Sequence, residues 1–252
     1  MILKDEFKKQ GAYLFRYRSF LPLLMLPLII LGLMTSFQIT KIYILLIYNI
    51  SCYVISSLGF GIRIFTIGHV PKRTSGRNTK KQTADSLNTT GIYSIVRHPL
   101  YLGNFLMWLG IILFVRSFWL IFIFILMFWI YYERIMFTEE EFLTDKFGEN
   151  YIKWADKTPL FFPNSKLWKK SDLPFSFKKV LKQEYPGLFG LVSCFTLIHF
   201  LKNLICRNQF FISLSWLIVF LVTMLFVFFT SKVTTISFEK SPLFSQPFST
   251  TR

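Results

Sequence analysis

Long apolar runs, separated by short polar segments, make up most of the chain. Six of these runs are candidates for membrane-spanning helices, since about 17–25 apolar residues are enough to cross a bilayer. The third and fourth are short, and each would cover only about 24 Å of a hydrocarbon core that is about 30 Å thick. A single polar position, Arg116, separates these two, which predicts a tight helical hairpin over 100–132. The predicted spans are 20–37, 42–65, 100–115, 117–132, 188–205 and 210–229.

Composition points to the same class of protein. Hydrophobic residues make up 53% of the 252 positions and charged residues only 17%, whereas soluble domains carry about 25% charged residues. The mean hydropathy is +0.47. These values exclude a disordered chain and an ordinary soluble enzyme, and they predict an all-α, polytopic membrane protein. The three cysteines are widely spaced without a C-x-x-C pair, so neither a disulfide scaffold nor a metal site is expected.

The basic residues predict the orientation in the membrane. The net charge is +16, and 24 of the 29 Lys and Arg fall on segments that the six spans place on one face. The positive-inside rule makes that face cytoplasmic, with both termini inside. Such residues also meet anionic lipid headgroups, so the charge indicates a membrane partner rather than nucleic acid. No small-residue cleavage site follows the first span, which is therefore expected to remain a membrane helix.

Two polar segments differ in character. Residues 71–91 are rich in Gly, Ser, Thr and basic residues, which predicts a loop. Residues 138–154 carry an apolar stripe at helical spacing, and Thr138 with Glu141 fits a capping box at the start of a helix. The predicted units are the N-terminal spans (1–67), a core (68–163), and a basic connector with the last two spans (164–252).

Polar groups gather where the third span enters the membrane. Pro99 suits the first turn of that helix, and the free N–H groups of the turn favour an anion beside Arg97 and His98. The helical hairpin then returns the chain to the same face. It brings three carboxylates towards the arginine and the histidine, namely Glu133, Glu139 and Glu140. We therefore expect a cytoplasmic pocket of Arg, His, Tyr and carboxylate side chains that suits a zwitterionic ligand.

Taken singly, the same residues have simpler interpretations. An Arg-His pair at a helix end is often a positive-inside anchor, and Tyr101 alone is typical of the membrane interface. The glutamates alone are typical of a solvated first turn. His199, inside the fifth predicted span, is either a packing group or an intramembrane functional group.

Together, however, two motifs resemble a known family. Gly91-Ile-Tyr-Ser-Ile-Val-Arg-His-Pro-Leu-Tyr-Leu-Gly103 resembles the Arg-His-Pro-x-Tyr signature of the isoprenylcysteine carboxyl methyltransferase and phospholipid methyltransferase superfamily. Glu139-Glu140-x-x-Leu143-x-x-x-Phe147-Gly148-Glu-Asn-Tyr151 is similar to its second motif. The resemblance covers about residues 58–163. Trp154 stands where the family usually has a second Tyr, and Ile92 replaces the Pro of a Gly-Pro-Tyr turn.

The resemblance implies an integral-membrane methyltransferase that uses S-adenosylmethionine. The carboxylate of the cofactor would suit His98 and the start of the helix. The amino group or ribose hydroxyls of the cofactor would suit a glutamate side chain. A positively charged sulfonium is tolerated by aromatic faces such as that of Tyr101. The residues expected to contact the cofactor are Tyr93, His98, Pro99, Tyr101, Gly103, Glu139 and Tyr151. Those expected to act in catalysis are Arg97, Glu133 and Glu140.

The methyl acceptor stays open at this point. The resemblance allows a lipid phosphate such as that of lipid A, a lipid amine such as that of phosphatidylethanolamine, or the carboxylate of a prenylated cysteine. The Lys-, Ile-, Phe- and Asn-rich composition is typical of an AT-rich, bacterial genome, where prenylated proteins are scarce, which favours a lipid. An NADPH-dependent membrane reductase of the same fold is a further alternative, although no Gly-rich dinucleotide motif is present.

Overall fold

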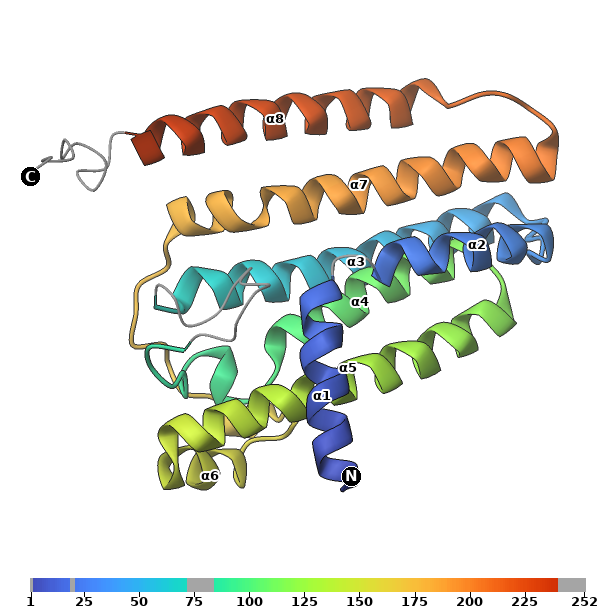
Figure 1. Ribbon diagram of the computed structural model, residues 1–252. Helices are drawn as coiled ribbons and strands as arrows, with labels where there is room; N and C mark the ends of the chain where they lie inside the picture. Colours follow the sequence, from blue (N-terminus) through green and yellow to red (C-terminus); the bar gives the residue numbers. More distant parts are fainter. Residues whose placement is uncertain (1, 19–20, 72–83, 240–252) are drawn as a thin grey trace, which may run out of the picture.

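The computed structural model describes residues 2–18, 21–71 and 84–239 (Figure 1). These ranges are helical apart from loops and one isolated β-bridge between Gly91 and Lys169. Four of the described helices are long and apolar enough to cross a membrane, and two apolar helices are shorter. The protein is thus an all-α, polytopic membrane protein. The elements are α1 (Leu3–Tyr17), α2 (Leu21–Met34), α3 (Ile42–His69), η1 (Ile92–Ser94), α4 (Pro99–Val115), α5 (Phe118–Phe147), α6 (Glu149–Ala155), η2 (Ser165–Leu167), α7 (Phe177–Arg207) and α8 (Leu214–Glu239).

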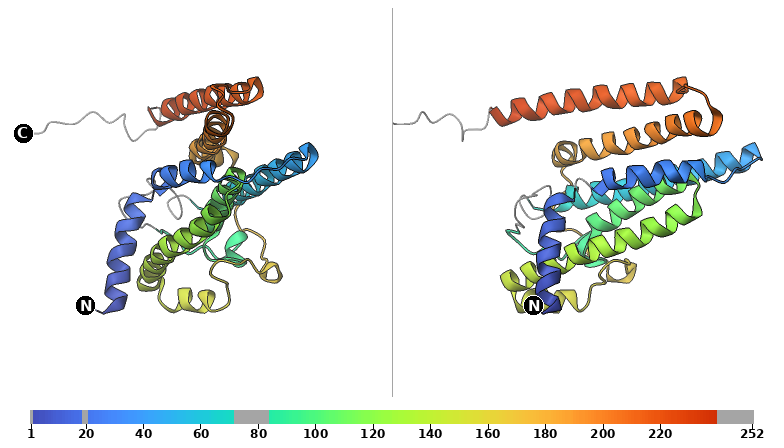
Figure 2. Two further views of the ribbon diagram at one scale, coloured as in Figure 1. Left: turned by 90° about the vertical axis from the view of Figure 1, so that its right-hand side faces the viewer. Right: turned by 45° about the vertical axis from the view of Figure 1, so that its right-hand side comes forward.

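The long helices run side by side, and α1 crosses them at one end of the bundle (Figures 1 and 2). Helix α3 packs closely along α4, where a Cβ added at Gly59 would lie 2.5 Å from the Gly103 carbonyl oxygen. Small residues permit such close backbone approach between membrane helices. Helix α7 lies against α2, α3 and α4, and α8 packs on α7 as the outermost helix of the bundle (Figure 2).

An aromatic core lies between α4 and α5. The ring of Phe105 packs against those of Phe124 and Phe128 at centroid distances of 5.8 and 5.0 Å. One turn further along α5, Tyr132 stacks on Phe128 at 4.1 Å. Because the three α5 rings are buried and Phe105 is half-buried against them, they hold the two helices of the hairpin in fixed register below the polar end of α4.

The hairpin itself has the tight turn that was expected. Arg116 ends α4 in the left-handed region at φ 66°, and its N–H donates to the Leu113 carbonyl at 2.9 Å. Ser117 is then the N-cap of α5. The carbonyl of Arg116 accepts from the Phe37 N–H at 2.9 Å, which attaches the turn to the chain that follows α2.

The prediction of a separate helix beginning at Thr138 was wrong. Helix α5 continues without a break for 30 residues to Phe147, so the fourth span is not short. Thr138 lies inside it and donates its hydroxyl to the Arg134 carbonyl one turn earlier at 3.0 Å, rather than capping a helix start. The break comes at Gly148, whose φ of 55° suits glycine and redirects the chain into α6. The residues on both sides of Thr138 continue the same helix, so the capping box does not begin a new one.

Two further boundaries differ from the prediction. Helix α7 begins at Phe177 rather than at 188 and contains Pro186, so part of the predicted connector is helical. The polar N-terminal segment, for which no element was predicted, forms α1, and its Gly11 and Phe15 are buried. Parts of the predicted basic loop (72–83) and of the basic tail (240–252) lie outside the described residues.

Candidate functional site

The chain that precedes α4 is fixed by the chain that follows α6. The Arg97 N–H donates to the Pro159 carbonyl at 2.9 Å, and the Asn164 N–H donates to the Ile95 carbonyl at 3.0 Å. The Gly91 N–H donates to the Lys169 carbonyl at 3.0 Å. These bonds hold Arg97 and the first turn of α4 in one orientation, although each joins residues 62 to 78 positions apart in the sequence.

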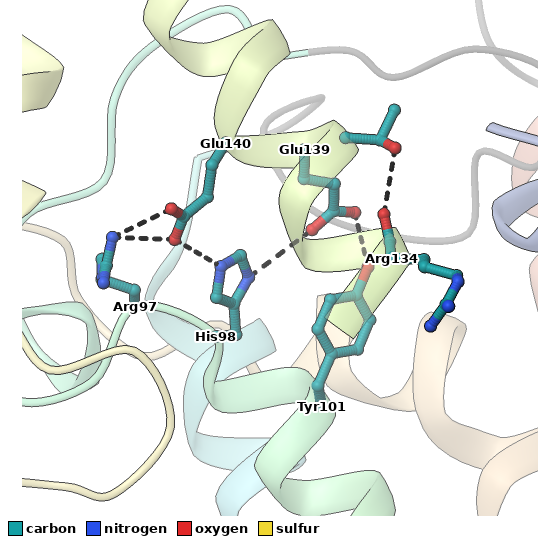
Figure 3. Close-up of polar contacts among 7 residues, drawn as sticks. Arg97, His98, Tyr101, Arg134, Glu139 and Glu140 are labelled. Carbon is teal, nitrogen blue, oxygen red and sulfur yellow. Dashed lines mark hydrogen bonds and ion pairs between the residues drawn. The ribbon is translucent and has the colours of Figure 1, made fainter. Parts of the chain in front are cut away.

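Five side chains meet at this point, from α5, from the first turn of α4 and from the two residues that precede α4 (Figure 3). Arg97 NH1 lies 2.9 and 3.0 Å from the two carboxylate oxygens of Glu140. His98 lies between the glutamates, with Nε2 3.1 Å from Glu140 Oε1 and Nδ1 3.6 Å from Glu139 Oε2. The Tyr101 hydroxyl donates to Glu139, and its ring stacks on the His98 ring at 5.6 Å. We call Arg97, His98, Tyr101, Glu139 and Glu140 the polar cluster.

The third glutamate of the run belongs to a different surface. Glu141 pairs with Lys4 at 2.9 Å and Lys8 at 3.2 Å, both on α1. Helix α1 packs tightly on α5 at Gly11, where a Cβ would overlap the Arg134 carbonyl and the Thr138 hydroxyl. Helix α1 therefore supports the turn of α5 that carries the two glutamates of the polar cluster.

The cluster favours a protonated histidine. Burial by itself lowers the pKa of His98, but hydrogen bonds and the negative charges of Glu139 and Glu140 outweigh burial, so the pKa is raised above its ordinary 6.5. Burial, and then the charge of Glu140, raises the pKa of the Tyr151 hydroxyl, which stays neutral. A cationic His98 between two carboxylates makes the cluster close to charge-balanced.

Three buried polar atoms beside the cluster lack a hydrogen-bond partner. They are Nε of Arg97, the hydroxyl of Tyr151 and the indole Nε1 of Trp154. Tyr151 is 3% exposed and feels the charges of Glu140 and Arg97 without making a well-oriented hydrogen bond to either. Because buried polar groups are nearly always satisfied, such a group of unsatisfied atoms indicates a ligand position. Two of the three can donate and the third can donate or accept.

The other predicted site residues have different surroundings. Pro99 occupies the first turn of α4, as its ring geometry favours. Gly103 lies close to α3, where an added Cβ would be 2.8 Å from the Gly59 carbonyl oxygen. Tyr93 lines a separate polar pocket of about 260 Å³, together with His69 and Asp172. The structure does not bring Glu133 into the polar cluster: its side chain is 46% exposed, and its carboxylate lies 4.0 Å from Arg134.

Sequence reasoning missed a second polar group below the cluster, formed by Arg63, Asn104, Tyr132 and Glu184. The one available signal was Arg63, an ionisable residue inside a predicted span, which is costly in a membrane. Glu184 gave no signal, because it lay in the predicted connector.

Comparison with known proteins agrees with the position of this site. The phospholipid methyltransferase family matches residues 74–150, which include the whole polar cluster. A cobalt-zinc-cadmium resistance protein, CzcN, from Cupriavidus metallidurans is 31% identical over 147 residues, which cover 55% of this chain and 65% of that protein. A protein-S-isoprenylcysteine O-methyltransferase from Schizosaccharomyces pombe is 34% identical over 85 residues, which cover 34% of this chain and 36% of that enzyme.

A nickel-cobalt-cadmium resistance protein, NccN, from Alcaligenes xylosoxydans is 33% identical over 111 residues. The chain thus spans 65% of the length of the first of these relatives and about half or less of the others. No solved structure matches the chain.

The fold and the site define a polytopic helical membrane protein with a charge-paired polar cluster at one end of a helical hairpin. Over part of its length, the chain is therefore similar to the isoprenylcysteine carboxyl methyltransferase and phospholipid methyltransferase superfamily.

Proposed function

We propose that the protein transfers a methyl group from S-adenosylmethionine to an acceptor embedded in the membrane. The observation that carries this proposal is the polar cluster, in which the two matching motifs meet although 38 to 43 positions separate their residues. Similarity to methyltransferases of the superfamily supports the same reaction.

The side chains present fit the cofactor. Arg97 and His98, beside the start of α4, suit a carboxylate. Glu139 and Glu140 suit an ammonium group or ribose hydroxyls. The unsatisfied atoms of Arg97, Tyr151 and Trp154 would gain partners from such a ligand. When bound, S-adenosylmethionine supplies a methyl group on a sulfonium, and the protein's part is to orient the reactants and to shape the electrostatics.

An anionic acceptor suits this site better than an amine. An amine must lose protons, and Glu140 is a weak base while Arg97 and His98 stabilise its carboxylate form. Glu133 is free of those partners but lies outside the cluster. A phosphate or carboxylate oxygen needs no base. We propose a lipid phosphate as the acceptor.

The carboxylate of a prenylated cysteine is the other anionic acceptor that the superfamily resemblance allows. It is supported by the relatives from Schizosaccharomyces pombe and Saccharomyces cerevisiae, which are protein-S-isoprenylcysteine O-methyltransferases. Two other relatives are named as metal-resistance proteins. In the described part of this chain, no three His, Cys, Asp or Glu side chains gather as a metal-binding group. We therefore relate the polar cluster to methyl transfer rather than to metal binding.

We further propose that the protein resides in a bacterial inner membrane with both termini in the cytoplasm. The positive-inside rule supports this orientation. The polar cluster then faces the cytoplasm, where S-adenosylmethionine is made, and the acceptor enters from the cytoplasmic leaflet.

The first experiment is binding of S-adenosylmethionine to the purified protein, followed by incubation of membranes with methyl-labelled donor. Arg97→Ala and His98→Ala should each weaken donor binding by about 10- to 150-fold, because a charge-assisted hydrogen bond is worth roughly 1.5–3 kcal/mol. His199→Ala is the control, since His199 contacts Asn203 and Trp216 far from the cluster. Label in extracted lipid supports a lipid acceptor, and label in protein supports a prenylcysteine. No binding, or equal losses in all three variants, would contradict the proposal.

A further inference from the structure

A buried ion pair joins the last two membrane helices to the core of the bundle. Arg63 on α3 donates from Nε to Glu184 Oε2 at 2.9 Å and from NH2 to Glu184 Oε1 at 2.7 Å. The Glu184 side chain, on α7, is 2% exposed and that of Arg63 is 16% exposed. Burying two charges costs free energy that their attraction only partly repays, and apolar residues of similar size often give equal stability. Stability alone therefore does not explain this ion pair, which indicates a functional role.

The remaining guanidinium nitrogen of Arg63, NH1, bonds to a residue of α4 near the polar cluster. Arg63 NH1 donates to the Asn104 side-chain oxygen at 2.7 Å. Because arginine can only donate, the Asn104 amide must present its oxygen to Arg63 and its NH₂ group elsewhere. That group donates to the Tyr132 hydroxyl at 3.2 Å. The ion pair thus fixes which way Asn104 is turned, and Asn104 in turn holds the Tyr132 hydroxyl.

Tyr132 completes the connection to the cluster. Its ring packs on the ring of Tyr101 with a centroid distance of 4.8 Å, and the Tyr101 hydroxyl donates to Glu139. Asn104 lies one turn beyond Tyr101 on α4, so both side chains face α5 on the same side of the helix. An unbroken series of contacts therefore runs from Glu184 on α7 to Glu139 in the polar cluster.

The backbone around the pair is shaped to admit it. A Cβ at Gly103 would lie 2.6 Å from Arg63 Cγ, so the absence of a side chain there makes room for the arginine stem. A Cβ at Gly187, on α7, would lie 3.3 Å from Glu184 Oε2. Gly103 belongs to the sequence motif next to Asn104, whereas Gly187 and Glu184 lie beyond residue 150, where the family match ends.

We propose that Arg63 and Glu184 are positioning residues for methyl transfer, which act through Asn104 and Tyr132 on the ring of Tyr101. This inference rests on the proposed function. Its consequence is that α7, which lies outside the family match, completes the active site instead of serving only as an added membrane anchor. Neither residue of the pair touches the reacting atoms.

The test replaces both charges at once, by Arg63→Met with Glu184→Leu. The double variant should fold with a melting temperature close to that of the unaltered protein, since no unpaired charge remains. Its kcat should fall by about 10- to 100-fold, the cost expected when a reacting group is displaced by about 1 Å, while affinity for S-adenosylmethionine changes less than threefold. The single variant Arg63→Lys should have a kcat between those of the double variant and the unaltered protein. Lysine keeps the charge but lacks the planar guanidinium that bonds to Glu184 and Asn104 together.

Lys202→Met is the matched control. Lys202 is a buried cation on α7 that reaches α4, where its ammonium donates to the Phe114 carbonyl at 3.1 Å, at the opposite end of the bundle. Loss of that contact should leave kcat unchanged. If a double variant that folds and binds donor keeps the kcat of the unaltered protein, the pair is structural only and the inference is wrong.

A double-mutant cycle tests the connection itself. Asn104→Ala and Tyr132→Phe leave the ion pair in place and should each lower kcat, and combining either with the double variant should add little. Full additivity would overturn the inference. These two variants also carry the test if the double variant does not fold. Absence of methyl transfer by the unaltered protein would instead contradict the proposed function, so the two failures are distinguishable.

Discussion

At the scale of single residues, the polar cluster depends on one buried histidine between two carboxylates. His98 contacts Glu139 and Glu140 through its two ring nitrogens, so a protonated ring satisfies both at once. A neutral ring can donate from only one nitrogen. The protonation state of His98 therefore determines how much positive charge the cluster offers to an anionic ligand group.

Binding of S-adenosylhomocysteine, which carries the carboxylate without the sulfonium, should depend on pH through His98. The pKa of His98 is raised above 6.5, so affinity should be highest below the raised pKa and should fall as the pH rises through it. The contribution of His98 to folding stability depends on pH in the same direction. It is fully present below pH 6.5 and is lost as the pH rises through the raised pKa. Calorimetric titration between pH 5 and about 9 measures the first effect. His98→Gln should flatten the profile, and an unchanged profile in that variant would exclude His98 as its source.

At the scale of helices, the cluster depends on how α1 and the 156–169 segment support α4 and α5. Helix α1 is tied to α5 by Lys4 and Lys8 on Glu141, by Gln10 on Arg134 at 2.8 Å, and by the Tyr131 hydroxyl on the Leu14 carbonyl at 2.9 Å. Exposed ion pairs contribute little by themselves. The close contact at Gly11 therefore matters more for the position of α5.

Gly11→Ala should destabilise the protein by about 1–3 kcal/mol, because the new methyl group would overlap the Arg134 carbonyl. Gly190→Ala is the matched control: the same change at an exposed position of α7 meets no atom within 4 Å, and it should be neutral or stabilising by up to about 1 kcal/mol. Thermal unfolding in one detergent, measured for both variants, gives the comparison. Equal melting temperatures would mean that α1 is not closely packed on α5.

At the scale of the whole molecule, the basic connector joins the polar cluster region to the last two helices. Lys166, Lys169, Lys170 and Lys178 are exposed. Lys179 is not equivalent to them, because its ammonium donates to the Val70 carbonyl at 2.6 Å and the Pro71 carbonyl at 3.0 Å, at the end of α3. Only the exposed lysines are therefore suited to test attraction of an anionic headgroup.

Replacing Lys166, Lys169, Lys170 and Lys178 together by glutamine should raise the apparent KM for an anionic lipid acceptor and weaken the salt dependence of the rate. Each lysine near an anionic surface is worth about 1 kcal/mol, although the contributions will not simply add. Affinity for S-adenosylmethionine should hardly change, since none of the four belongs to the polar cluster. Loss of donor binding with normal methylation would show that the roles of core and connector are reversed.

Topology can be tested independently of activity. Reporter fusions after Arg252 and in the turn between α7 and α8, near residue 209, should report opposite sides of the membrane, with the first in the cytoplasm. The reason is the strong excess of Lys and Arg on one predicted face. Reports from the same side would mean that α7 and α8 do not both cross the membrane.

The sequence by itself determined the class of protein, the hairpin turn, and the meeting of Arg97 and His98 with glutamates of the returning helix. Apolar runs of membrane length and a charge bias are properties of composition and local order, and the turn needs only Arg116 and Ser117. The juxtaposition of Arg97 and His98 with Glu139 and Glu140 follows because a hairpin must return the chain to the face from which it left. It was predictable without knowing any packing.

Only the tertiary structure decided which glutamates join the cluster, where α5 ends, and how α7 meets the core. Glu133, Glu139 and Glu141 share one helix, but their contacts differ because α1 and α4 lie on different faces of α5. Helix α5 runs through Thr138 to its end at Gly148 despite the local capping signal, and the burial of Glu184 depends on Arg63, a partner distant in sequence. A pattern of residue types does not specify a pair such as Arg63 and Glu184, 121 positions apart, because long-range pairing is selected by packing of the whole bundle.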